Sequence, residues 1–450
     1  MMLKIKLPSN VKTILSVLHN AGYDAYVVGG CVRDSIMGKT PDDWDICTDA
    51  TPDQMLDLFD KNCYKTIPTG IKHGTITVML NGIGYECTTY RIDGNYSDRR
   101  RPDNVTFTDN LIKDLKRRDF TINAMAYNEE KGLIDPFNGK TDIQHRIIRC
   151  VGNAKDRFSE DALRIMRALR FSVRFKFRLH PDTHRQMHLL ADNLNNIAIE
   201  RINTEFCKII AEQSAPPVLL NSTRIISRFI PEIMDAVDFD QNNPYHQYPV
   251  FDHIMKALSR CKSNDIITRL AVLFHDIGKP HCYQDGDDGY RHFKGHGNVS
   301  AEITEKIMHR MRFDNDTISK TVELVKYHDA TFEVNKKCIR RWLNRIGEEQ
   351  FRRLLDVRVA DIKGQKDDYD IERINKVDNI RKLLDEILAE NACFALKDLA
   401  VNGKDLIEIG YKPGPELGKI LNELLNRVID ENLSNDKQIL IAFAKNAISD

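Results

Sequence analysis

The sequence predicts an α+β protein, with a small sheet domain at the start of the chain and mostly helical domains after it. Within the first 145 residues, short apolar runs with the alternation typical of strands occur at 25–28, 75–80 and 84–90. Beyond that point, apolar residues recur every three or four positions, which is the period of amphipathic helices. A chain of 450 residues is expected to hold about two to four domains.

Composition narrows the class of protein. The chain holds 66 basic and 66 acidic residues, so any nucleic-acid binding must come from local patches rather than from a basic whole. Its 10 cysteines are scattered without CxxC pairs, which favours reduced thiols in the cytoplasm over a disulfide framework or zinc knuckles. No segment approaches a membrane span, so no membrane partner is expected.

The first elements build a turn suited to phosphate. An amphipathic helix is predicted over 11–20, and the apolar strand at 25–28 runs directly into Gly29 and Gly30. A helix-like run containing Arg33 follows. Glycines let the backbone approach a phosphate group closely, and the N-terminus of a helix favours negative charge.

Two aspartates follow in the segment DDWD. We predict a strand here, in which Asp43 and Asp45 project from one face while Trp44 enters the core on the other. Two carboxylates on one face suit Mg²⁺, which prefers oxygen ligands and commonly keeps substrate phosphates as partners. A lone Asp-x-Asp pair is usually part of a solvated turn. Coming after the strand, the glycines and Arg33, it instead predicts a site that holds a nucleoside triphosphate over a metal.

A third acidic residue lies further along the predicted sheet. Thr51-Pro52 begins another helix, and Asn81-Gly82 joins the runs at 75–80 and 84–90 in a β-hairpin. Glu86 falls inside the second run of this hairpin. It belongs either to an exposed face of the sheet or to the metal site, as a third carboxylate beside the two aspartates.

Arginines dominate the next stretch. Arg99–Arg101, followed by proline, predict a mobile basic loop. Arg117, Arg118 and Asp119 precede a predicted apolar helix that carries Asn123. An arginine doublet is most often a solvated face, but after a metal site it is suited to clamp a triphosphate, because guanidinium binds phosphate bidentately.

Four motifs occur in a recognisable order: GGCVRD, DDWD, RRDFTINAMAY and EDALRIMRALRF. Over roughly its first half, the chain resembles the bacterial-type tRNA nucleotidyltransferases (CCA-adding enzymes) and poly(A) polymerases. The resemblance implies a polymerase-β-like nucleotidyltransferase sheet domain. It also implies that an RNA 3′-hydroxyl attacks the α-phosphate of a nucleotide and releases pyrophosphate, with two metals supporting the reaction.

The resemblance implies roles for named residues. Asp43 and Asp45 hold the catalytic Mg²⁺ ions. Glu86 is a candidate third catalytic carboxylate on the strand pattern alone. Arg118 binds the nucleotide and Asp119 contacts its ribose. The full set of nucleotide-binding residues implied is Gly29, Gly30, Arg33, Arg118, Asp119, Asn123, Asp161, Arg164, Arg167 and Arg170.

Base selection is predicted for the segment 160–171. Asp161 and Arg164 lie three apart, which predicts one shared helix face. A carboxylate accepts hydrogen bonds and a guanidinium only donates them. Cytosine and adenine both present an amino donor beside a ring-nitrogen acceptor, so this pair would accept C or A and reject U or G without a template. In isolation, an ordinary helix salt bridge explains the same spacing.

The second half of the chain carries a different signature. His253 lies in VFDHIMKAL, His275 and Asp276 lie in LAVLFHDIGKP, and Asp361 lies in VRVADIKG. With this spacing, residues 245–365 resemble an HD metal-dependent phosphohydrolase domain, in which histidine and carboxylate ligands hold a divalent transition metal that activates water. His296 and His328 are candidates for a second metal or for phosphate binding. The four ligands implied by the resemblance are His253, His275, Asp276 and Asp361.

These observations predict a cytoplasmic enzyme that adds CCA to the tRNA 3′ end from CTP and ATP. The resemblance implies that relatives which add only CC have a shortened loop before RRDF, and the loop DGNYSDRRRPDNVTF is not shortened, which favours complete addition. The GKDL and GPELG elements resemble the tail of CCA-adding enzymes and favour tRNA as substrate. Three alternatives remain: an enzyme that adds only CC or only A, a poly(A) polymerase, and a protein that is primarily an HD phosphohydrolase. The predicted domains are a catalytic head at 1–145, a helical neck at 146–215, the HD domain at 245–365 and a tRNA-binding tail at 366–450.

Overall fold

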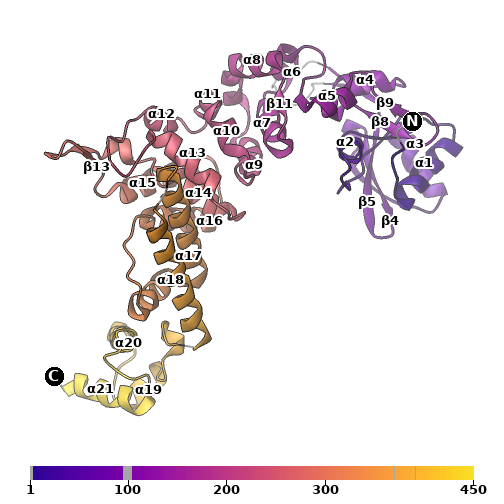
Figure 1. Cartoon of the computed structure of the whole chain (residues 1–450). Helices are drawn as coiled ribbons and strands as arrows, with labels where there is room; N and C mark the ends of the chain where they lie inside the picture. The colour runs from indigo at the N-terminus through magenta and orange to yellow at the C-terminus, as the bar shows by residue number, and fades with distance from the viewer. Residues whose placement is uncertain (1–3, 95–103, 369, 391, 450) are drawn as a thin grey trace. The chain divides into compact units, whose positions relative to one another are not determined.

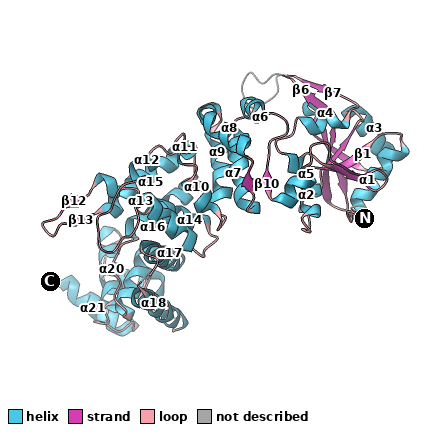
Figure 2. Ribbon diagram, turned by 45° about the horizontal axis from the view of Figure 1, so that its top comes forward, coloured by secondary structure: helices cyan, strands magenta, loops and turns pink. Residues whose placement is uncertain are grey.

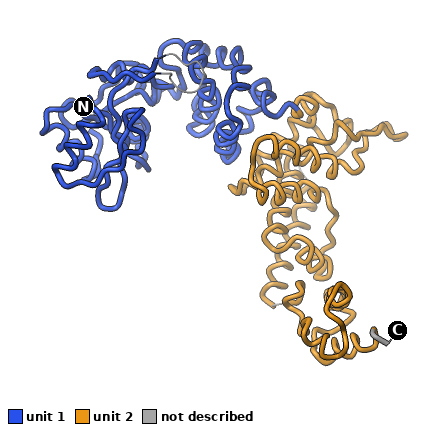
Figure 3. The backbone as a smooth tube through the Cα atoms, turned by 180° about the vertical axis from the view of Figure 1, so that it is seen from behind, with its two compact units in different colours: residues 1–231 blue, residues 232–450 orange. Residues whose placement is uncertain are grey.

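The chain forms two compact units, Met1–Pro231 and Glu232–Asp450 (Figure 1; Figure 3). The computed structural model describes residues 4–94, 104–368, 370–390 and 392–449. The basic loop predicted at Arg99–Arg101 lies outside these residues. The finer division into four domains stays a prediction. Among the described helices, none combines the length and the hydrophobicity needed to cross a bilayer.

A seven-stranded mixed sheet forms the base of the first unit (Figure 2). The strands follow the order β3-β4-β5-β2-β1-β8-β9, in which β2 and β5 are parallel and the other neighbours are antiparallel. This sheet confirms the α+β class. The strands are β1 (Ala25–Val28), β2 (Ile46–Thr48), β3 (Lys65–Gly70), β4 (Thr75–Leu80), β5 (Ile83–Thr89), β8 (Ala126–Asn128) and β9 (Gly132–Ile134). The smaller pairs are β6 (Arg91–Asp93) with β7 (Val105–Phe107) and β10 (Ile147–Ile148) with β11 (Arg178–Leu179).

Local sequence explains the first helices and the hairpin, and these predictions are confirmed. Asn81 and Gly82 have φ angles of 51° and 79°, the left-handed values that a two-residue hairpin turn requires. Helix α1 (Ser9–Asn20) buries one apolar face. Helix α3 (Pro52–Lys61) begins with a capping box at Thr51, which satisfies backbone N–H groups of its first turn.

Helices make up most of the remaining first unit. Pro216 and Pro217 stand in the first turn of α10, where proline is tolerated, so the unit does not end there but continues to Pro231. The helices are α2 (Gly30–Ile36), α4 (Leu111–Lys116), α5 (Gly139–His145), α6 (Ala154–Glu160), α7 (Leu163–Phe175), α8 (Pro181–Leu189), α9 (Ile199–Ile210), α10 (Ala215–Leu220) and α11 (Thr223–Ile226). Short 3₁₀ turns are η1 (Ile71–His73), η2 (Thr121–Asn123) and η3 (Ala191–Asn196).

Two helix predictions are wrong. The apolar helix expected to carry Asn123 is only the turn η2, which leads into β8. The helix expected to carry both Asp161 and Arg164 is broken, because α6 ends at Glu160 and α7 begins at Leu163. The Asp161 carboxylate accepts a 3.0 Å hydrogen bond from the backbone N–H of Leu163, a local bond that competes with helix continuation.

The second unit is almost entirely helical. Helix α17 is interrupted at Gly347, whose φ of 77° lies outside the helical region. Helices α17 and α18 lie side by side (Figure 1). The helices are α12 (Ile233–Ala236), α13 (Val250–Arg260), α14 (Ile266–Phe274), α15 (His296–Arg310), α16 (Asn315–Tyr327), α17 (Lys336–Gln365), α18 (Ile371–Ala389), α19 (Gly403–Glu408), α20 (Pro415–Ile429) and α21 (Lys437–Ser449). The remaining elements are η4 (Lys279–His281), η5 (Leu396–Asp398) and the strand pair β12 (Gln284–Asp285) and β13 (Arg291–His292).

Candidate active sites

The predicted carboxylates of the first unit gather beside strand β2. Asp43 and Asp45 are exposed and precede Ile46, the first residue of β2, so the prediction that they lie within the strand is wrong. Because Ile46 pairs with Cys87 in the parallel neighbour β5, the preceding residue Asp45 lies beside Glu86, which is exposed as well. The three acidic side chains therefore share one region of the sheet.

Electrostatics at this region favour a cation. Solvent reaches Asp45, yet the surrounding protein raises the pKa of its carboxyl, and the charges of Glu86 and Asp43 raise it further against the opposing effect of Arg118. Carboxylates that repel one another are stabilised by a divalent ion with oxygen ligands. The donor set thus fits Mg²⁺.

Gly29 brings the backbone against Arg118. Its φ is 79°, and a Cβ built at this position would lie 2.9 Å from Nη1 of Arg118. A side chain here would therefore displace the guanidinium. Arg118 is held in turn by the buried carboxylate of Asp114, with 3.5 Å between Nη2 and Oδ2, and Arg117 binds the same carboxylate at 2.8 Å. The sequence analysis missed Asp114, which links both arginines of the doublet.

Four predicted nucleotide-binding residues form one hydrogen-bonded network, in which three are buried and Arg167 is half-buried. Arg33 donates a 2.6 Å hydrogen bond to Oδ1 of Asn123, and Asn123 donates a 3.0 Å bond to Asp119. Arg167 donates to the other oxygen of Asp119 over 2.8 Å, while Asp34 binds the far side of Arg33 at 2.9 Å. Burial by itself raises the pKa of Asp119, but Arg167 and Asn123 outweigh it and lower that pKa to about 2.

The side chains of the predicted base-selecting pair bind other partners, although the backbone N–H of Arg164 donates a 3.0 Å hydrogen bond to the carbonyl oxygen of Asp161. Arg164 donates to Glu160 over 2.7 Å and to the carbonyl oxygens of Arg157 and Arg117 over 3.1 Å. The second carboxylate oxygen of Asp161 makes a long contact of 3.4 Å with Arg201.

Arg170, which the resemblance placed at the nucleotide, forms a buried ion pair at 3.1 Å with Glu205 of α9. It also stacks over Phe171, its guanidinium carbon 4.6 Å from the ring centroid. Phe171 is buried, as are Phe175 and Phe177, so these aromatic residues belong to the core of the first unit.

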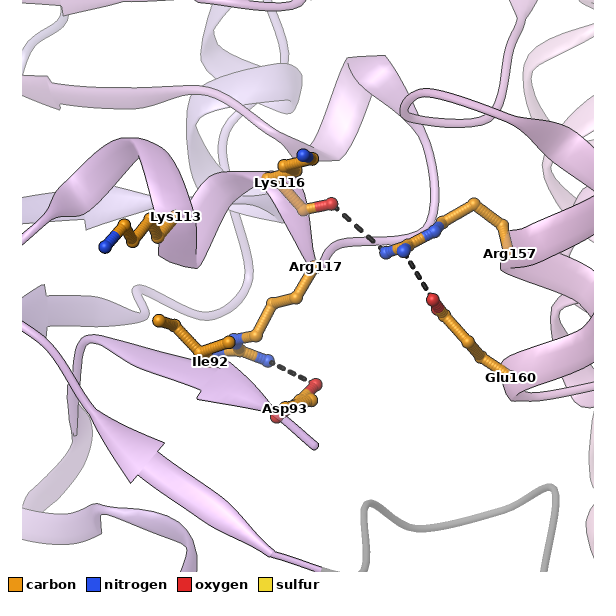
Figure 4. A pocket seen from close by; sticks show the side chains of 7 residues that line it. All are labelled: Ile92, Asp93, Lys113, Lys116, Arg117, Arg157 and Glu160. Carbon is orange, nitrogen blue, oxygen red and sulfur yellow. Dashed lines mark hydrogen bonds and ion pairs between the residues drawn. The ribbon is translucent and has the colours of Figure 1, made fainter. Parts of the chain in front are cut away.

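A cavity of about 330 Å³ opens on the outer side of the arginine doublet (Figure 4). Arg117 lies 3.8 Å from Asp93, and Arg157 contacts both Glu160 and the carbonyl oxygen of Lys116. The lining holds more cations than carboxylates, so it favours an anion. The residues that line it are Ile92, Asp93, Lys113, Lys116, Arg117, Arg157 and Glu160.

In the second unit, the structure brings all four predicted ligands together. His253 comes from α13, His275 and Asp276 follow α14, and Asp361 comes from α17. Ligand atoms of His253, His275 and Asp276 lie within 4.8 Å of one another. Oδ1 of Asp361 lies 3.2 Å from Nε2 of His253 and 3.7 Å from Nε2 of His275. All four side chains are buried.

A second group shares one of these ligands. Asp276, His296 and His328 also have ligand atoms within 4.8 Å of one another. Oδ1 of Asp276 faces His296 at 3.2 Å and His328 at 3.5 Å, whereas its Oδ2 faces His253 at 3.1 Å and His275 at 3.3 Å. The two oxygens of one carboxylate thus face two separate sets of histidines.

The orientation of the rings suits metal binding. Nδ1 of His275, His296 and His328 lies 2.7, 2.8 and 2.7 Å from a backbone carbonyl oxygen three residues earlier. A carbonyl only accepts hydrogen bonds, so Nδ1 carries a proton and Nε2 is the nitrogen directed toward a metal. Burial alone lowers the pKa of His275, but Asp276 and Asp361 outweigh it and raise that pKa to about 10, which indicates a region that stabilises positive charge.

A buried lysine, which the sequence analysis missed, completes the surroundings. Nζ of Lys279 lies 2.7 Å from Oδ2 of Asp276 and donates a 2.8 Å bond to Gln241. The motif HDIGKP places this lysine three residues after Asp276, so the sequence did hold a signal for it.

Comparison with protein families supports the arrangement. Residues 25–149 match the family described as the poly A polymerase head domain. Residues 176–237 match a polymerase A RNA-binding site, and residues 293–444 match tRNA nucleotidyltransferase domain 2.

Curated relatives extend over nearly the whole chain. The CCA-adding enzyme of Levilactobacillus brevis is 34% identical, with 96% of each chain covered. That of Leuconostoc mesenteroides is 33% identical over 98% of this chain and 97% of the relative.

Solved structures of CCA-adding enzymes have the same fold as this chain. The crystal structure of the Bacillus stearothermophilus CCA-adding enzyme in complex with CTP matches with a TM-score of 0.73 and 27% identity, covering 98% of both chains. The Thermotoga maritima CCA-adding enzyme complexed with tRNA matches with a TM-score of 0.65 and 21% identity, covering 99% of this chain and 97% of the other, which supports the fold.

Proposed function

The chain belongs to the CCA-adding enzyme family, and from this premise we propose that it adds C, C and A to the 3′ end of tRNA without a nucleic-acid template. CTP and ATP are the nucleotide substrates, and tRNA is the partner. The reaction is nucleotidyl transfer: the tRNA 3′-oxygen bonds to the α-phosphorus, and pyrophosphate leaves.

The observation that carries this proposal is the group of carboxylates beside β2, whose charge is opposed by the cation Arg118. The backbone of Gly29 lies close to the Arg118 guanidinium. The family uses divalent metal, and Mg²⁺ bound by Asp43 and Asp45 would activate the 3′-hydroxyl and stabilise the leaving oxygens. Arg118 then neutralises phosphate charge, and the absence of a side chain at Gly29 leaves room for its guanidinium.

Asp161 and Arg164 stay the proposed base-selecting pair. The 3.4 Å contact of Asp161 with Arg201 is long, so an exocyclic amino group of C or A would replace it readily. Arg164 must exchange one of its carbonyl acceptors for a ring nitrogen of the base. We propose that Arg33, Asn123, Asp119 and Arg167 hold the neighbouring phosphate and ribose groups as one unit.

Incorporation of labelled CTP and ATP tests this function. The substrates are tRNAs that end at the discriminator base, at C and at CC, with Mg²⁺ present. Extension of all three that stops at CCA is the expected result. Use of only one nucleotide would indicate partial addition, and long A tails would indicate poly(A) synthesis.

We also propose that the second unit is a metal-dependent phosphohydrolase. The supporting observation is the pair of ligand groups that share Asp276, with three histidine rings fixed by backbone carbonyls. Imidazole and carboxylate ligands suit divalent transition metals, and a metal bound here would supply activated water. Metal analysis of the purified protein and hydrolysis of p-nitrophenyl phosphate by the His275→Ala variant test this proposal.

A further inference from the structure

A cationic pocket of about 110 Å³ lies next to the metal-ligand groups of the second unit. Three basic residues line it: Arg358 from α17, and Arg373 and Lys376 from α18. The nine residues that line the pocket include no carboxylate. Positive charge therefore converges here without an acidic residue in the lining to balance it.

Arg358 connects this pocket to the ligands. It stands one helical turn before Asp361 on α17, with 3.6 Å between its Nη1 and Oδ2 of Asp361. The same Nη1 donates a 3.2 Å hydrogen bond to the backbone carbonyl oxygen of His328. One guanidinium thus contacts a residue from each of the two ligand groups, so the pocket and the metal site share a wall.

The other two cations face the same space. Arg373 is half-buried and donates a 2.7 Å bond to the neutral side chain of Gln365. Burial, followed by the nearby charge of Arg358, lowers the pKa of Arg373, and the charges of Asp361 and Asp370 offset this only in part. Lys376 is exposed at the rim. A bound anion would relieve the repulsion between Arg358 and Arg373.

The floor of the pocket is apolar. Phe332, Ile362 and Val377 line it, and all three are buried. A cationic rim above an apolar floor suits an organic phosphate, whose oxyanion binds guanidinium bidentately while its organic part covers the floor. A metal ion would not bind here, because the lining offers cations in place of ligands.

We propose that this pocket binds a phosphate group of a phosphate-ester substrate, next to the metal site of the second unit. The inference rests on the proposed phosphohydrolase function. In that hydrolysis, the oxygen of water bonds to phosphorus, the bond from phosphorus to the ester oxygen breaks, and the proton goes to the departing alcohol. The ester is carried either by a free nucleotide or by the end of an RNA chain.

The test uses the full-length, metal-loaded protein and inorganic phosphate as the probe. Calorimetry compares the wild type with the double variant Arg373→Gln/Lys376→Gln. The matched control is Lys382→Gln, which removes an exposed cation from the same helix but outside the pocket. We expect phosphate affinity to fall at least ten-fold in the double variant and to stay unchanged in the control, with metal content and thermal midpoint preserved in both.

Kinetics separate binding from turnover. With p-nitrophenyl phosphate, the double variant should raise KM at least ten-fold and leave kcat within about two-fold, because neither residue is a proposed metal ligand. Competition by a nucleoside monophosphate and by an oligoribonucleotide with a 3′-phosphate identifies the carrier of the ester. The carrier that competes more strongly in the wild type should lose more of its affinity in the double variant.

Two results would overturn the proposal: a wild type that binds no phosphate, or a double variant that binds phosphate as tightly as Lys382→Gln. Failure of the hydrolase itself is distinguishable. If the wild type binds phosphate through Arg373 and Lys376 but hydrolyses no ester, the pocket stands and the proposed phosphohydrolase function fails.

Discussion

Arg33 donates a 2.6 Å hydrogen bond to the side-chain oxygen of Asn123, a residue 90 positions further along the chain. Both side chains are buried, and Asn123 also donates to Asp119. Asn123→Ala should therefore lower the free energy of unfolding by about 1–3 kcal/mol, because it leaves buried polar groups without partners. Urea unfolding measures this, with the exposed Asn221→Ala as the control. Equal losses in the two variants would contradict a special role for Asn123.

We expect a substitution among the carboxylates beside β2 to reduce nucleotide incorporation sharply. Asp45→Asn should lower the rate of CTP incorporation with Mg²⁺ by at least about 100-fold, because metal stabilisation of the transition state amounts to several kcal/mol. Asp42→Asn, an exposed neighbour outside the proposed metal site, is the matched control. Hydrolysis by the second unit should persist in both variants. Undiminished incorporation by Asp45→Asn would remove this residue from the metal site.

We expect a side chain added at Gly29 to weaken nucleotide binding. Gly29→Ala places a methyl group 2.9 Å from the Arg118 guanidinium, in a backbone conformation with φ of 79°. Gly38→Ala shares the positive φ, 72°, but its added methyl group meets nothing within 4 Å. Both variants should lose stability from backbone strain, about 1–3 kcal/mol, and the loss should be larger for Gly29→Ala because the ψ of −123° at Gly29 lies outside the left-handed helical region. Only Gly29→Ala should raise the KM for CTP. Equal KM values would show that the contact with Arg118 does not matter for binding.

We expect the Asp119 carboxylate to make a pH-dependent contribution to the free energy of unfolding. Its pKa in the folded protein is about 2, against 3.8 for the free group. Because the folded value is the lower one, the contribution of about 2 kcal/mol is present above pH 4 and is lost as the pH falls toward 2. Asp119→Asn should accordingly be less stable than wild type near pH 6, and the difference should shrink toward pH 2.

The measurement can follow the first unit alone. The chain has two tryptophans, Trp44 in the first unit and Trp342 in the second. In a Trp342→Phe background, fluorescence during urea unfolding reports on the first unit, and Asp60→Asn provides an exposed aspartate as control. A difference in stability that stays constant across this pH range would rule out the coupling of Asp119 with Arg167.

Because the Asp276 carboxylate belongs to both ligand groups, we expect variants of the second unit to retain different amounts of metal. Asp276→Asn should lose metal from both ligand groups, because each oxygen faces a different set of histidines. His296→Ala should lose only the metal of the group that it completes. Metal-to-protein ratios by mass spectrometry distinguish the two, with the exposed His309→Ala as a control. Equal ratios in Asp276→Asn and His296→Ala would indicate a single ion.

Sequence predicted the parts of the fold that local patterns determine. The hairpin at Asn81-Gly82 and the start of α3 at Thr51 depend on neighbouring residues only, and both are confirmed. The break between α6 and α7 was missed because the spacing of Asp161 and Arg164 suggested a continuous helix. Aspartate commonly caps helices, so Asp161 carried a signal for the break that the spacing argument overlooked.

The candidate nucleotide site depends on tertiary contacts that the spacing of residues in the sequence does not reveal. Besides the adjacent Asp34, Arg33 binds Asn123, and Arg170 binds Glu205; Asn123 and Glu205 come from distant segments. Asp114, which holds Arg117 and Arg118, is an acidic residue in a short helix and has no motif to mark it. Family resemblance named the residues that face the substrates, and tertiary packing determined the residues that hold them.

The interruption of α17 at Gly347 has a consequence for how this protein tolerates change in length. Residues on the two sides of the break do not share one helical phase, so the segment before it does not dictate the direction of Asp361 after it. An inserted or deleted residue in a continuous helix turns everything beyond it by about 100°. Here such a change at Gly347 would be absorbed at the break, and Arg358 and Asp361 would keep their orientation.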